Sequence, residues 1–126
     1  MMRRFFLFLS EQRGIRRWME TSSVSRKFTK RFIAGETLEQ ALGVSASLER
    51  QGIQSTLDHL GEKVTSLEEA TRSCDACLDA LREIAARRLP ATVSIKLTQF
   101  GLDLGEQVCF DLVQRLLEPA RTLKTP

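Results

Sequence analysis

Two short aliphatic segments, residues 53–58 and 92–98, flank one long amphipathic segment, residues 66–86. In the second short segment apolar and polar side chains alternate, as they do in a strand with one buried face. In the long segment the apolar residues recur at the spacing of a helix. Two strands joined by a crossover helix of this length should run parallel. The sequence therefore predicts an α/β fold.

Further helices are predicted on either side of this unit. Segments 3–20 and 24–33 suit two basic helices, and a third helix opens at Thr37, where Gln40 completes a capping box. A final helix is predicted to start at Asp103 and to run to about residue 118, with Glu106 completing its cap. The crossover helix has the same signature in Ser66 and Glu69. Because two parallel strands make a marginal sheet, the chain has the pattern of a larger, repeating α/β fold that continues.

Charge divides the chain into two regions. Residues 1–31 hold nine Lys or Arg and two Asp or Glu, a net of +7; the rest hold ten and fourteen, a net of −4, and the sum is +3. We predict a basic N-terminal helical arm over residues 1–36 and an α/β domain over residues 37–126. Such an arm suggests an anionic partner, but the simpler and favoured interpretation is a solvated, basic helical hairpin.

The anionic partner is better matched by a membrane surface than by nucleic acid. Aromatic residues are not interleaved with the basic ones, as stacking on bases requires. The early apolar run Phe5–Leu9 is far shorter than the roughly 20 residues of a spanning helix. Arginines flank this run and Trp18, which favours peripheral membrane contact.

Three cysteines, an odd number, suit a reducing compartment. We therefore expect a cytoplasmic chain, peripheral to the inner face of a membrane.

Lys96 lies on the polar face of the second predicted strand, opposite Val93, Ile95 and Leu97. Burying an ammonium group is costly unless an anion meets it. The C-terminal ends of strands are also where α/β folds place ligands. Lys96 is therefore a candidate for holding a substrate carboxylate or for electrostatic help at a reacting centre. From spacing alone, a solvent-exposed lysine is an equal alternative.

Asp58, His59 and Glu62 follow the first predicted strand and form a second, weaker candidate cluster. They suit acid/base chemistry or half of a metal site, but the spacing of a metal motif such as HExxH is missing. The favoured interpretation is a tight loop at Gly61, with Glu62 paired to a basic group elsewhere. No metal site is predicted.

Cys74 and Cys77 match C-x-x-C, but they lie in the middle of a predicted helix. Redox-active thiols of this kind lie at helix N-termini, where the thiolate is stabilised. These two residues, and Cys109 in the last helix, are predicted to be small core residues. The sequence contains neither a Gly-rich phosphate loop nor a G-x-S-x-G nucleophile elbow.

Three segments occur in the order, and at about the spacing, of a known family. They are Arg31-Phe-Ile-Ala-Gly-Glu-Thr37, Thr56-Leu-Asp-His-Leu-Gly-Glu62 and Ser94-Ile-Lys-Leu-Thr-Gln-Phe-Gly-Leu-Asp103. In these segments the chain resembles the N-terminal part of proline dehydrogenase. The resemblance covers nearly all of this chain, but only about the first 40–50% of a family member of roughly 300 residues.

The resemblance implies a distorted (β/α)8 barrel preceded by helices. This chain would hold the N-terminal helices and the first two β/α units, and so an incomplete barrel. The implied activity is the FAD-dependent oxidation of L-proline to 1-pyrroline-5-carboxylate, with a quinone as electron acceptor, usually at a membrane. Lys96 matches the family's lysine that contacts the proline carboxylate beside the flavin. Glu62 matches the acidic residue of the loop that helps to gate the site.

Other parts of the family's site have no counterpart in residues 1–126. They are the aspartate of the third strand, the flavin-binding residues of strands four to six and a late arginine pair. We therefore expect this chain alone neither to bind FAD tightly nor to oxidise proline, and assign it no catalytic or cofactor-binding residue. A truncated product and a split enzyme with a complementing chain are both compatible with this. The alternative function is a non-catalytic binding module whose basic arm meets an anionic membrane surface.

Overall fold

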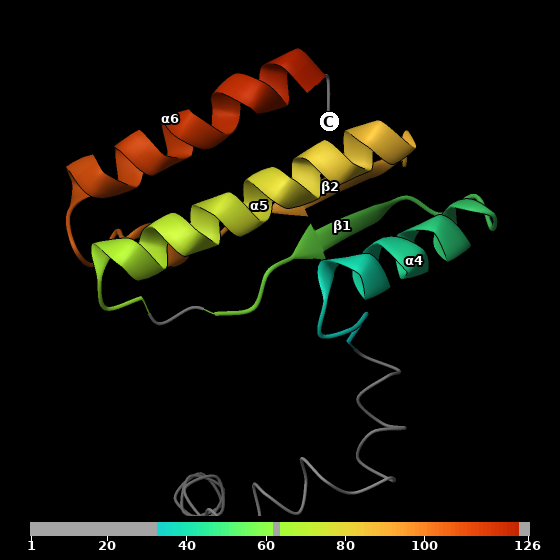
Figure 1. The fold of residues 1–126 in the computed structure, drawn as a ribbon, viewed down its shortest axis with the longest axis horizontal. Helices are drawn as coiled ribbons and strands as arrows, with labels where there is room; N and C mark the ends of the chain where they lie inside the picture. Colours follow the sequence, from blue (N-terminus) through green and yellow to red (C-terminus); the bar gives the residue numbers. More distant parts are fainter. Residues whose placement is uncertain (1–32, 62–63, 124–126) are drawn as a thin grey trace, which may run out of the picture. The chain divides into compact units, whose positions relative to one another are not determined.

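The computed structural model describes residues 33–61 and 64–123. The predicted helix over 3–20 lies outside these residues, and so does the helix over 24–33 apart from Ile33. The compact unit Thr37–Pro126 contains six described elements (Figure 1): α4 (Leu38–Glu49), β1 (Ser55–Asp58), α5 (Leu67–Arg87), β2 (Ala91–Ser94), the 3-10 helix η1 (Leu97–Phe100) and α6 (Glu106–Leu123).

The described strands form a two-stranded parallel sheet, with Ser55 opposite Ala91 and Asp58 opposite Ser94. Helix α5 is the crossover connection between the strands and runs alongside them (Figure 1). The predicted parallel pairing and the α/β character are therefore confirmed. The larger barrel stays a prediction, because the described residues contain these two strands and the helices beside them.

The sequence pattern predicted that the first strand starts at Ile53. In the structure it starts at Ser55. The Ile53 N–H donates to the carbonyl of Leu48, 3.0 Å away, and thereby closes the C-terminus of α4. Gly52 has a φ of +74°, which is the left-handed conformation that this kind of helix end requires. The Ile53 amide is thus used by the helix, and its side chain is exposed.

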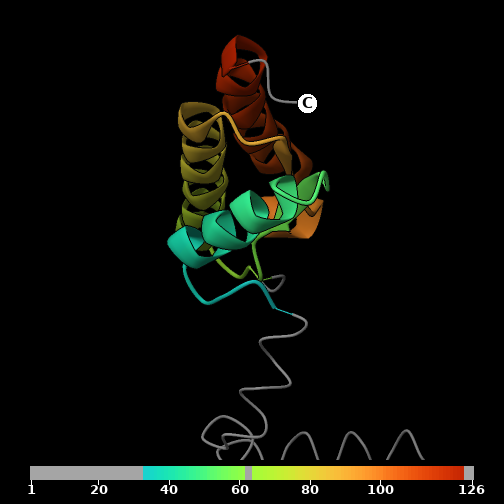
Figure 2. The same ribbon diagram turned by 90° about the vertical axis from the view of Figure 1, so that its right-hand side faces the viewer.

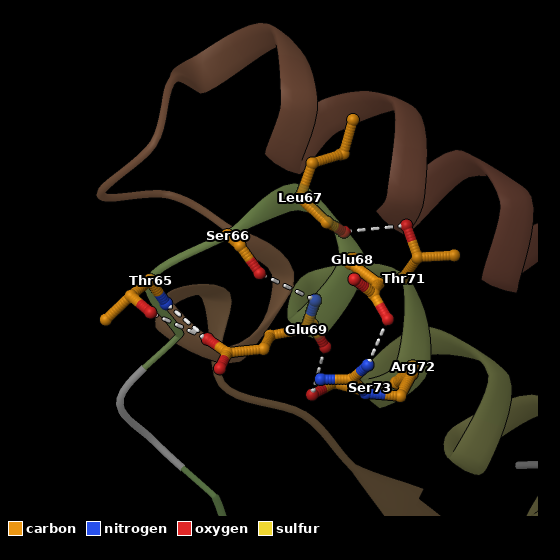
Figure 3. Close-up of polar contacts among 8 residues, drawn as sticks. All are labelled: Thr65, Ser66, Leu67, Glu68, Glu69, Thr71, Arg72 and Ser73. Atoms are coloured by element: carbon orange, nitrogen blue, oxygen red, sulfur yellow. Dashed lines mark hydrogen bonds and ion pairs between the residues drawn. The ribbon is translucent and has the colours of Figure 1, made fainter.

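Two of the three predicted helix caps are present. The Thr37 hydroxyl accepts a hydrogen bond from the Gln40 N–H at 3.3 Å. The Ser66 hydroxyl accepts one from the Glu69 N–H at 3.2 Å, as Figure 3 shows. These bonds satisfy amide donors that a helix N-terminus otherwise leaves without a partner.

The main core lies between α5 and α6, which run side by side in both views (Figures 1 and 2). Residues of α5, η1 and α6 contribute to it, and Val93 and Ile95 pack against it from the strand segment. Leu67 belongs to the helical apolar pattern of segment 66–86, but it is the first residue of α5 and its side chain is exposed. The buried members are Val64, Ala70, Cys74, Cys77, Leu78, Leu81, Phe100, Cys109, Leu112 and Leu116.

A smaller core cluster holds α4 against the rest of the unit. Leu42 of α4 is buried with Ile84 of α5 and Ala91 of β2. The Ser45 and Ser55 hydroxyls, 2.8 Å apart, connect α4 to the start of β1 by a hydrogen bond. Helix α4 therefore covers β1 and the C-terminal half of α5.

Helix α6 differs from the prediction at both ends. The Gly105 carbonyl accepts the first helical bond, from the Cys109 N–H, so Asp103 lies before the cap, in the preceding turn. The helix also continues through Pro119 to Leu123. Proline removes one backbone donor, but Ala120 and Leu123 pack against the main core, and this packing keeps the last turn helical.

Candidate functional site

The C-terminal ends of β1 and β2 bring Asp58 and Lys96 together. Asp58 lies opposite Ser94, and Lys96 follows Ser94 by two residues, on the same side of the extended backbone. The Lys96 Nζ is 2.6 Å from the Asp58 Oδ2, and the two side chains are 37% and 38% exposed. This is the distance of a charge-assisted hydrogen bond, formed at the boundary between protein and solvent.

The pair lies on the polar face of the sheet. Because side chains alternate along a strand, the register places Thr56 and Asp58 of β1 beside Thr92 and Ser94 of β2. The opposite face packs against the helices through Leu57 and Val93. The sheet therefore has one apolar, covered face and one polar face that ends in the Asp58–Lys96 pair.

The sequence predicted that the second strand runs to Thr98. In the structure β2 ends at Ser94. Its partner strand ends at Asp58, so Ile95 and Lys96 have no residue opposite them in the β1–β2 ladder. Lys96 keeps extended angles, with φ −118° and ψ 128°, and the chain then turns into η1. Leu97, predicted to be on the buried face, is 49% exposed as a result. Lys96 itself is neither fully buried nor fully exposed, so it falls between the two alternatives that the sequence left open.

Gln99 is a structural residue that sequence reasoning missed. Its side chain is buried, at 1% exposure, and its Nε2 donates a hydrogen bond to the carbonyl of His59. This bond connects η1, which follows β2, to the loop that follows β1. The only signal in the sequence is a glutamine placed directly before Phe100 and Gly101, where the chain must turn.

His59 lies at the rim of an open hollow of about 400 Å³, which Gly61, Val64, Glu69 and Arg72 also line. The polar groups there already have local partners (Figure 3). The Glu69 carboxylate accepts bonds from the Thr65 N–H and hydroxyl, at 2.7 and 3.0 Å. Arg72 pairs with Glu68 one helical turn earlier. These contacts fix the N-terminus of α5, and they already use the Glu69 and Arg72 side chains that line the hollow with His59.

The remaining candidates are settled in part. Glu62 lies outside the described residues, so its role as a gating residue stays a prediction. Within residues 33–61 and 64–123, no group of three or more His, Cys, Asp or Glu is placed to hold a metal ion. Cys74 and Cys77 are buried in the main core, as predicted for small core residues. Burial raises the pKa of the Cys77 thiol to about 11 and also raises the pKa of Cys74.

Proteins named proline dehydrogenase match the chain over most of its length. Proline dehydrogenase 1 of Bacillus subtilis (strain 168) is 35% identical over 121 residues, which is 96% of this chain. Proline dehydrogenase 2 of the same strain is 33% identical over 97% of the chain. The proline dehydrogenase of Deinococcus radiodurans is 33% identical over 73% of it. The chain is a homologue of the N-terminal part of proline dehydrogenase.

The family resemblance read from the three sequence segments is thereby confirmed. The chain spans 40% of the length of the Bacillus subtilis proline dehydrogenases that it matches. No protein-family model matches the chain. Among the described residues, no helix is both long and apolar enough to cross a membrane. The comparisons give no support to the alternative of a non-catalytic module at a membrane surface.

Proposed function

We propose that residues 37–126 supply the first two strands of a proline dehydrogenase site, in which Lys96 binds the carboxylate of L-proline. The observation that carries the proposal is the position of Lys96. Its ammonium group lies at the C-terminal ends of two parallel strands, on their polar face, within 2.6 Å of a carboxylate oxygen. A site that already holds one carboxylate at Lys96 has the chemistry to meet a second one.

The name proline dehydrogenase describes a redox enzyme. The resemblance to this family implies that FAD is the group that accepts hydride from proline. The described residues do not form a flavin site by themselves. Two open hollows of about 400 and 420 Å³ lie beside α5, and neither is lined by Lys96. Within the described residues, none of the turns that connect the helices and strands is a Gly-rich, phosphate-binding loop. We therefore assign flavin contacts to residues outside the described ranges, and propose that residues 1–126 alone neither bind FAD tightly nor oxidise proline.

The other contacts of the site would come from polypeptide equivalent to the remaining 60% or so of the relatives, given the 40% that the chain spans. That polypeptide can be a continuation of the same chain or a separate complementing chain. Glu62 is proposed to act in the gating loop that follows β1. A quinone is the proposed electron acceptor, and the basic residues before Phe32 would favour contact with the anionic surface of the membrane that contains it.

Reconstitution tests this function. Purified residues 1–126 are mixed with a polypeptide that covers the remaining length of Bacillus subtilis proline dehydrogenase 1, and flavin absorbance and proline-dependent dye reduction are measured. We expect neither signal from residues 1–126 alone and both from the mixture. Lys96→Ala should reduce dye reduction at least about tenfold, as expected for loss of a charged substrate contact.

Two results would contradict the proposal. Turnover of proline by residues 1–126 alone would show that the site is complete without further polypeptide. A reconstituted enzyme that keeps full activity with Lys96→Ala would remove Lys96 from the substrate site. Arg82→Ala is the matched control, because Arg82 is an exposed cation on α5 that pairs with Asp79, away from the strand ends.

A further inference from the structure

Helix α6 carries an exposed apolar stripe next to its buried face. The buried face consists of Cys109, Leu112 and Leu116, which belong to the main core. Phe110 and Leu117 are 56% and 44% exposed, and they lie about two turns apart on one side of the helix. Figure 1 shows α6 at the edge of the described unit, with α5 along one side of it. An exposed apolar stripe in this position is suited to contact with another polypeptide.

The two ends of the stripe carry opposite charges. Glu106 lies four residues before Phe110, and Arg121 lies four residues after Leu117, so each charge is about one helical turn beyond an apolar residue. Both charged residues are exposed. The order along this side of α6 is therefore acidic, apolar, apolar and basic. When the helix is turned end for end, each apolar residue meets the other apolar residue and each charge meets the opposite charge.

We propose that this stripe is the contact surface of a homodimer, in which the α6 helices of two copies pack antiparallel about a twofold axis. Phe110 of each copy then faces Leu117 of the other, and Glu106 of each copy faces Arg121 of the other. A twofold contact uses the same surface of both copies and has to be self-complementary, as this stripe is. The antiparallel arrangement also brings opposite ends of the two helix dipoles together.

The contact is small, so the dimer should be weak and its population should depend on concentration. Burial of Phe110 and Leu117, with the half-buried Val113 between them, supplies most of the attraction. The ion pairs at the two ends are exposed, and each contributes little. Their main effect is to fix the direction and the register of the two helices. This inference is independent of the proposed function, because it involves neither Lys96 nor a substrate.

Charge reversal tests this register. Sedimentation equilibrium of residues 1–126 gives the dissociation constant of the dimer for the wild type, Glu106→Arg and Arg121→Glu. Each single variant places like charges opposite each other at both ends of the contact, so its dissociation constant should rise about five- to twentyfold at low salt. An equimolar mixture of the two variants should associate about as well as the wild type, because opposite charges meet again at both ends.

The controls separate the contact from effects on folding and net charge. Glu49→Arg, at the exposed end of α4, changes the net charge by the same amount as Glu106→Arg and should leave the dissociation constant unchanged. Far-UV circular dichroism shows whether each variant is folded. The mixture contains the same two chains as the single samples, so poor folding of a variant cannot produce the recovery.

Three results would overturn the proposal. The first is a wild-type chain that sediments as a monomer at every concentration. The second is a mixture that associates no better than the two variants do separately, which would show a different arrangement of the helices. The third concerns the polypeptide used for reconstitution. If the wild-type chain does not dimerise but Phe110→Glu weakens its binding to that polypeptide, the stripe is a contact for that polypeptide and not for a second copy.

Discussion

At the scale of single residues, Gly101 shows how closely three elements approach each other. It ends η1 with a φ of +79°, a conformation that residues with a side chain rarely adopt. A Cβ atom at this position would lie 3.3 Å from the Ala70 Cβ of α5 and 3.2 Å from the Val108 Cγ1 of α6. Gly101 is therefore required by both its backbone conformation and the space around it.

Gly101→Ala should lower the free energy of unfolding by at least about 1–2 kcal/mol, the cost of a left-handed residue that carries a Cβ. Gly43→Ala is the matched control, because Gly43 lies inside α4 with nothing within 4 Å of an added Cβ. That change should instead raise stability by about 0.5–1 kcal/mol. Denaturant unfolding measures both, and equal effects of the two substitutions would refute this account of Gly101.

The three thiols should be unreactive in the folded chain. Cys74, Cys77 and Cys109 are free and buried, and burial raises the pKa of Cys77 to about 11 from its ordinary 9. At pH 8 this shift alone reduces the thiolate about 100-fold. Cys77 should therefore react with a chromogenic disulfide at least about 100-fold more slowly in the native chain than in denaturing guanidinium chloride. Burial also raises the pKa of Cys74 and of Cys109, so their reaction should be slowed too. Rapid native reaction of two thiols would instead indicate a working C-x-x-C pair.

At the scale of elements, the N-terminus of α5 is stabilised by Glu69. Its carboxylate accepts bonds from the Thr65 N–H and hydroxyl, and these bonds lower its pKa below the ordinary value. A carboxyl group whose pKa is lower in the folded state stabilises the fold above its unfolded pKa. This stability is lost as the pH falls through the folded pKa.

We therefore expect the free energy of unfolding to fall between about pH 5 and pH 3, and Glu69→Gln to make this fall shallower. The measurement is denaturant unfolding across the pH range. Glu118→Gln, which removes a charge from the exposed surface of α6, is the control for net charge. A pH profile that is the same for wild type and Glu69→Gln would show that the cap does not contribute.

Local patterns predicted the starts of α4 and α5 well, but not the start of α6, where Asp103 lies before the cap. The caps at Thr37 and Ser66 and the crossover α5 follow from residues that are close in sequence. The predictions were wrong where a distant partner decides: β2 ends at Ser94 because β1 ends opposite it, and α6 passes Pro119 because core contacts hold the next turn. Asp58 and Lys96 are 38 residues apart in the sequence, so predicting this ion pair requires the register of the two strands as well as the residue types.

At the scale of the whole molecule, α6 presents a second apolar stripe away from its core. Phe110 is 56% exposed and Leu117 is 44% exposed, and they lie two helical turns apart on one side of the helix. Leu102 and Leu104, in the turn before α6, are also exposed. Adjacent apolar groups of this kind favour association, so we expect residues 1–126 to self-associate in solution.

The double variant Phe110→Glu and Leu117→Glu should shift the sedimentation of the chain towards the monomer, with a melting temperature within a few degrees of the wild type. Leu67→Glu, which places one carboxylate at an exposed position at the start of α5, should leave association unchanged. If the double variant and the wild type sediment alike at every concentration, this stripe is not the contact.

The bond between Gln99 and His59 determines which of these two positions tolerates substitution. Gln99 contacts the backbone carbonyl of residue 59 and not the imidazole. Every amino acid supplies that carbonyl, so a change at His59 keeps the connection between the two loops, whereas a change at Gln99 removes it. Among natural variants of this chain, position 59 should therefore drift freely while position 99 stays glutamine.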